Sequence, residues 1–112
     1  MISSGQIREI IAQYEKHGWT LRRVFLSPPT RESPGVDETV FGETPVTPAE
    51  IDAVWFSRPS ASGGEAWELR RLSGSPFALI EIFDDEDDET VRDEIRHEIE
   101  RQMESGKRKI EK

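Results

Sequence analysis

The chain of 112 residues contains no cysteine, only two histidines and no long apolar run. The lack of cysteine excludes disulfide bonds, thiol catalysis and thiolate metal sites, and it suits a reducing compartment. No segment approaches the roughly 20 apolar residues that a membrane-spanning helix needs. We therefore expect a cytoplasmic protein without membrane association.

Apolar residues are also scarce over the whole chain. Hydrophobic residues make up 34% of it, and the mean hydropathy is −0.67. Three tryptophans and five phenylalanines nevertheless supply enough large side chains for a modest core. A chain of this length forms one domain of ordinary size, so we expect a single small domain over residues 1–112.

Acidic residues outnumber basic ones, which gives a formal net charge of −8, and residues 81–112 carry −6 of it. Such a surface disfavours nucleic acid and anionic membranes as partners. Six consecutive acids, Asp84–Glu89, precede a helical pattern that ends near Ser105, and Gly106 is a natural stop. Basic residues follow, and both charge clusters complement the helix dipole. We expect an acidic lead-in and a charged C-terminal helix over residues 84–112.

The start of the chain has a clear helix signal. Ser3 is followed three residues later by Gln6, the spacing of a capping box. Gly18 is a natural residue to end a helix. We expect a helix over residues 3–17 whose buried stripe consists of Ile7, Ile10, Ile11 and Tyr14.

A strand and a long connection follow this helix. Residues 19–26 are rich in β-branched and aromatic side chains, which predicts a strand. Residues 27–48 hold five of the seven prolines and are expected to form an irregular Pro-rich loop. Thr47, Pro48 and Glu50 have the form of a capping box with proline at the first helical position, which predicts one or two helical turns there.

Three further strands are expected at residues 54–58, 65–72 and 76–83. Short turns that contain glycine separate them, as in antiparallel hairpins. The last strand is apolar on both faces, which favours a central or helix-covered position in the sheet. The order of elements predicts an α+β fold, with an antiparallel sheet of about four strands and N- and C-terminal helices.

One sequence repeat connects two of the expected strands. Residues 19–28 (WTLRRVFLSP) and 67–76 (WELRRLSGSP) are identical at six of ten positions. Alternate residues of a strand share a face. We therefore expect Trp19, Leu21 and Arg23 on one face, and likewise Trp67, Leu69 and Arg71, with Arg22 and Arg70 on the opposite faces.

If these strands are neighbours, four guanidinium groups gather in one region. The resulting candidate site for an anion or a partner consists of Arg22, Arg23, Arg70, Arg71, Trp19 and Trp67. In the alternative interpretation, Glu68, Glu81 and the acidic helix neutralise these arginines.

The sequence contains no pattern typical of a catalytic or metal site. His17 closes the first helix, where a capping role explains it. His97 follows Glu94 in an E-x-x-H spacing, but carboxylate-bridged metal sites need a second such motif. A nucleophile elbow, a phosphate-binding glycine loop and a zinc-ligand cluster are all missing. We expect no enzyme activity, no metal and no cofactor, and we identify no small-molecule ligand.

These observations favour a non-catalytic cytoplasmic protein that acts by binding another protein or a second copy of itself as a homodimer. A free sheet edge is one surface for such pairing. The alternative is a nucleic-acid or phosphate-anion binding module that uses the strand arginines. An exposed tryptophan within a basic patch would favour the alternative, and arginines paired with carboxylates would favour protein binding.

Overall fold

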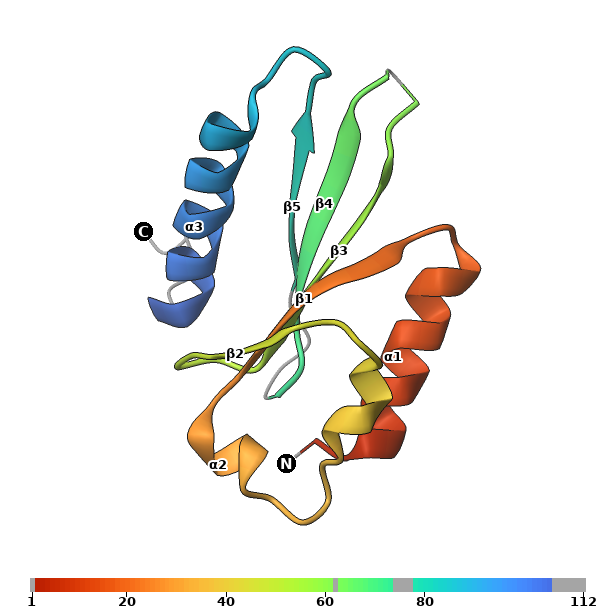
Figure 1. Cartoon of the computed structure of the whole chain (residues 1–112), viewed down its shortest axis with the longest axis vertical. Helices are drawn as coiled ribbons and strands as arrows, with labels where there is room; N and C mark the ends of the chain where they lie inside the picture. Colours follow the sequence, from red (N-terminus) through yellow and green to blue (C-terminus); the bar gives the residue numbers. More distant parts are fainter. Residues whose placement is uncertain (1, 62, 74–77, 106–112) are drawn as a thin grey trace.

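A computed structural model describes residues 2–61, 63–73 and 78–105. Five strands form one sheet in the order β2-β1-β3-β4-β5, in which β1 and β2 are parallel and the other neighbours antiparallel (Figure 1). The expected α+β class is confirmed, with one strand more than expected. The elements are α1 (Ser4–Lys16), β1 (Thr20–Leu26), α2 (Pro28–Arg31), η1 (Glu38–Phe41), β2 (Val46–Pro48), β3 (Ala53–Pro59), β4 (Glu65–Arg71), β5 (Ala78–Phe83) and α3 (Glu89–Ser105).

The two long helices lie on opposite faces of the sheet (Figure 1), so each face has its own core. The capping box of Ser3 and Gln6 at the start of α1 is confirmed. On the α1 face, the buried side chains are Ile2, Ile7, Ile11, Val24, Leu26, Phe41, Val54, Phe56 and Leu72. On the α3 face, they are Ile51, Ala53, Trp55, Trp67, Leu69, Phe83, Ile99 and Met103.

The segment expected to be an irregular loop contains three ordered elements, α2, η1 and β2. The expected helical turns after Thr47 are wrong. The backbone there pairs with β1 instead: the Val24 N–H donates to the Pro45 carbonyl at 3.2 Å, and the Ala49 N–H donates to Leu26 at 3.1 Å. A capping signal is worth only about 0.5–2 kcal/mol, so pairing with a central strand overrides it.

A bulge in β1 changes which side chains share a face. The register between β1 and β3 shifts between Leu21 and Arg23. Leu21 therefore packs on the α1 face with Val24, whereas Arg23 reaches α3 on the other face. The expectation that Leu21 and Arg23 point the same way is wrong, because a bulge inserts an extra residue and interrupts the alternation.

The last strand, β5, lies at the edge of the sheet and not in its centre. Its α3 face is covered, since Phe83 is 1% exposed. Its other face is open, because Ile80 and Ile82 are each 55% exposed. Of the two expected positions, the central one is therefore wrong, whereas the helix-covered one holds for the face that α3 covers. The expected strand start at Pro76 and the helix stop at Gly106 lie outside the described residues.

A buried carboxylate connects three strands at one end of the sheet through hydrogen bonds. Asp52, 6% exposed, accepts hydrogen bonds from the Ser27 N–H at 2.7 Å and from the hydroxyls of Thr30 at 2.7 Å and Ser73 at 2.9 Å. Burial alone would raise the pKa of Asp52, but these hydrogen bonds outweigh it and hold the pKa below its ordinary value. The network joins the ends of β1 and β4 to the start of β3.

A glycine lets the other end of the sheet close. A Cβ atom on Gly64 would lie 1.7 Å from the carbonyl oxygen of Phe83. The hairpin before β4 and the end of β5 therefore approach each other so closely that only glycine fits. Within the described residues, no helix combines the length and the apolar character that crossing a membrane requires.

Candidate functional site

The arginines predicted to cluster do not form one group. Strand β3 lies between β1 and β4, so the two repeated segments are not neighbours. Arg22 and Arg23 approach Trp67 on the α3 face. Arg70 lies on the α1 face, where it lines a hollow beside α1. Arg71 follows it at the end of β4 and is partly exposed.

The two repeated tryptophans also lie on opposite faces. Trp19 packs partly buried on the α1 face, with the Arg58 guanidinium 4.8 Å from its ring centre. Trp67 is 5% exposed on the α3 face. Neither indole is a free stacking platform, because arginine covers the first and the core encloses the second.

A different group of cations surrounds Trp67, and the sequence pattern did not reveal it. The guanidinium of Arg96, from α3, lies 4.3 Å from the Trp67 ring centre and 5.8 Å from that of Phe83. Those of Arg22 and Arg23 lie 5.5 and 5.9 Å from Trp67. Arg96 is 1% exposed although it stands in a highly charged helix, so charge alone could not indicate its burial.

Carboxylates of α3 pair with these cations. Asp93 accepts from Arg23 at 3.4 Å and from Arg96 at 3.3 Å, and Glu89 also pairs with Arg96. Partial burial would raise the pKa of Asp93, but His97, Arg96 and Arg23 together hold it below its ordinary value. Arg23 and Arg96 are thus paired within the fold, whereas Arg22 makes no ion pair with a described residue.

Two nitrogens of Arg96, Nε and Nη1, are buried and have no hydrogen-bond partner among the described residues. Solvent does not reach them, so an external anion would have to displace α3 to bind there. Their contact with the rings of Trp67 and Phe83 partly compensates for the missing hydrogen bonds. We interpret the arrangement as a packing contact between α3 and the sheet.

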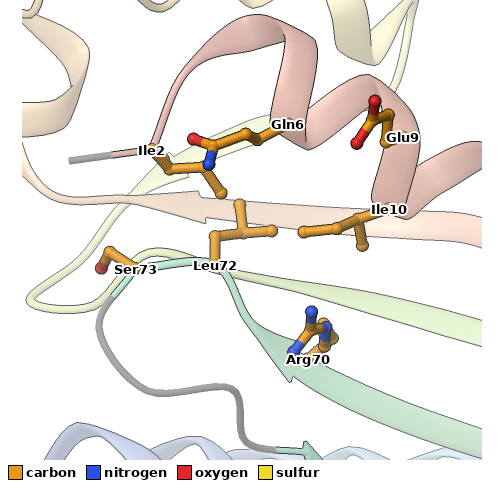
Figure 2. Close-up of a pocket in the computed structure, with 7 residues that line it drawn as sticks. All are labelled: Ile2, Gln6, Glu9, Ile10, Arg70, Leu72 and Ser73. Atoms are coloured by element: carbon orange, nitrogen blue, oxygen red, sulfur yellow. The ribbon is translucent and has the colours of Figure 1, made fainter.

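A groove runs between α1 and β4 on the other face. It contains a hollow of about 380 Å³. Figure 2 shows Ile2, Ile10 and Leu72 converging there beside Arg70. Arg70 makes no ion pair with any residue that the structure describes. A second hollow of about 220 Å³ lies further along α1, beside Tyr14.

Tyr14 lines this groove and connects α1 to strands β3 and β4. Its ring stacks on Phe56 with centroids 4.0 Å apart, and its hydroxyl donates to the Glu68 carboxylate. Burial and this bond to an anion both raise the pKa of Tyr14, so the hydroxyl stays protonated. Glu68 stands opposite Ile80 in the β4–β5 register, which places Ile80 and Ile82 on the same face as the groove.

The sequence analysis expected a free sheet edge, but it did not predict that β5 forms it. Ile80 and Ile82 point to the α1 face, but α1 packs over β1 and leaves β5 bare. Within the described residues, only one other large apolar side chain is exposed, Val91 of α3 at 42%.

Val91 belongs to the flank of α3 that faces the β5 edge. The opposite flank contacts strands further into the sheet: Asp93 pairs with Arg23 of β1, and Glu100 accepts from the Trp55 indole of β3 at 2.8 Å. At 100° per residue, Val91 is turned about 180° from Glu100. The exposed apolar side chains therefore lie on both sides of one strand edge. We call Ile80, Ile82 and Val91 the edge patch.

The described residues contain no group of three or more His, Asp or Glu side chains arranged to hold a metal ion. His17 caps α1 with its ring nitrogen 3.0 Å from the Gln13 carbonyl oxygen, and His97 is exposed beside Asp93. Comparisons with protein-family models, curated proteins and solved structures found no match to this chain.

Proposed function

We propose that this protein is a non-catalytic binding module that takes up a strand of a partner protein at the edge of β5. One observation carries the proposal. All three large apolar side chains that are exposed in the described part of the chain belong either to the open face of β5 or to the α3 flank beside it. Exposed apolar side chains that gather at one place are typical of protein interaction sites.

An added strand would satisfy both the backbone and the side chains of this edge. The outer side of β5 pairs with no described strand, so its backbone groups are available for hydrogen bonds. Side chains of an added strand alternate between faces. One set would contact Ile80 and Ile82, and the other set would contact the flank of α3 at Val91 and Ile95.

The edge lacks most of the usual features that prevent pairing, the exception being one inward-pointing charge. Natural edge strands are often short, bulged, or protected by lysine and proline. The described strand β5 has six residues, contains neither lysine nor proline, and keeps a regular register with β4. Its one charged residue is Glu81, which points to the α3 face.

The arrangement of the predicted arginines disfavours a single anion site. Only Arg23 pairs with a carboxylate of α3, and the other three predicted arginines make no ion pair with a described residue, but β3 separates the pair on β1 from the pair on β4. The predicted site would also need an exposed aromatic face, and Trp67 is buried.

Co-purification of the tagged chain from its own source tests the proposal. Ile80→Lys and Ile82→Lys place a charge on the edge patch and should abolish capture of the partner. Thr47→Lys is the matched control, because Thr47 is exposed on the edge strand at the opposite end of the sheet. Recovery of the same proteins by the wild type and both edge variants would contradict the proposal.

A further inference from the structure

We propose that the strand taken up by this edge is β5 of a second copy, so that two chains form a homodimer with a continuous sheet of ten strands. The inference rests on the proposed function, since it names the partner of the same edge. The two copies would be related by a two-fold axis perpendicular to the sheet, with their β5 strands antiparallel.

The sequence of β5 is compatible with itself in one such register. A two-fold axis at Ile80 sets Ile80 against its own copy and Ile82 against Ala78. The same register sets Glu81 against Leu79, so no like charges face each other. An axis at Glu81 would instead place two carboxylates opposite each other. The register centred at Ile80 joins the isoleucines of both copies into one apolar strip on the α1 face.

The position of α3 suits the same arrangement. The helix packs against both β4 and β5, and it runs alongside β5 in Figure 1. Neighbouring strands lie about 4.8 Å apart. If each helix lies midway over β4 and β5, the two α3 axes of the dimer are about 10 Å apart, which is close to the ordinary spacing of packed helices. The flanks that meet would carry Val91 and Ile95, and also Glu98, which is turned only about 20° from Val91 at 100° per residue and pairs with Arg101 of its own helix.

Charge favours the antiparallel orientation. The acidic turn 84–88 follows the C-terminal end of β5, whereas Arg70 and Arg71 end β4 beside the opposite end of β5. Neither arginine makes an ion pair within the described residues. Antiparallel pairing brings the acidic turn of each copy toward the arginines of the other. Parallel pairing would bring the two acidic turns together.

Disulfide cross-linking tests the register, because the chain has no native cysteine. Facing residues of antiparallel strands have Cα atoms about 4.5–5.5 Å apart, which lies within the range that a disulfide spans. Under mild oxidation, Ile80→Cys should therefore form a covalent dimer at least about tenfold faster than Thr47→Cys, which reports random collision. A mixture of Ala78→Cys and Ile82→Cys should cross-link between the two variants.

Cross-linking of Ile80→Cys at the rate of Thr47→Cys would overturn self-pairing. Faster cross-linking of Ile82→Cys alone than of Ile80→Cys would overturn the register. The binding function itself fails on a different result, namely equal partner capture by the wild type and Ile80→Lys. Far-ultraviolet circular dichroism of each variant shows that the fold is retained.

Discussion

Trp67 is the residue through which the sheet contacts Arg96 of α3. The sequence predicted that Trp67 and Leu69 share a face of their strand, and both lie in the core on the α3 face. It did not predict that Arg96 lies on the Trp67 ring. The buried stripe of a helix is inferred from the spacing of its apolar residues, and an arginine is not counted among them. Buried arginines remain stable only when they are paired, and here Asp93 and Glu89 supply the charge.

Trp67→Ala should lower the free energy of unfolding by about 3–5 kcal/mol, because it leaves a large cavity and removes the ring on which Arg96 lies. Arg22→Ala, at an exposed position on the same ring, should change it by about 0.5 kcal/mol or less. Urea denaturation monitored by circular dichroism measures both changes. Equal effects of the two substitutions would contradict the packing described here.

Asp52 should make the free energy of unfolding depend on pH in the acidic range. Its pKa in the folded state is below the ordinary value of about 4, so the ionised form stabilises the fold. This contribution is complete above the unfolded-state pKa and is lost as the pH falls through the lower, folded-state pKa. Asp52→Asn should therefore cost more stability at neutral pH than near pH 3. Urea midpoints of both proteins at the two pH values check this, and an unchanged difference would count against the network.

At the scale of the elements, the apolar pattern of β5 was the least informative feature. A strand that is apolar on both faces has the same sequence pattern whether it lies in the centre of a sheet or at an edge with one face exposed. Only the order of the strands distinguishes them, and that order depends on contacts between distant parts of the chain. The bulge in β1 escaped prediction for a related reason, since no local signal at Arg22 marks the extra residue.

Gly64→Ala should disrupt the pairing of β5 with the hairpin before β4. The added methyl group would meet the backbone carbonyl of Phe83, which cannot turn aside as a flexible side chain would. We expect hydrogen exchange at the Phe83 end of β5 to accelerate more than exchange in β1. Gly5→Ala is the matched control, because its nearest neighbour is the Ser3 Oγ at 3.9 Å. Unchanged protection of β5 in Gly64→Ala would show that this close approach does not hold the strand.

For the whole molecule, the two long helices, four of the strands and the α+β class followed from local patterns, whereas α2 and η1 did not. The fifth strand, β2, did not, because its three residues pair with β1 only once the chain has folded back. The candidate arginine site relied on β1 and β4 being neighbours, and β3 separates them. The edge patch appears only in the assembled sheet, where α1 covers one half of its face and leaves the other half bare.

Sedimentation equilibrium of the wild-type chain measures whether two copies pair through their β5 edges. We expect a mass that rises with concentration from 12.8 kDa toward twice that value. At the same concentrations, Ile80→Lys should remain at the mass of one chain, and Thr47→Lys should behave like the wild type. A wild-type mass that stays at 12.8 kDa up to the highest soluble concentration, or an Ile80→Lys variant that dimerises equally, would contradict the pairing of two β5 edges.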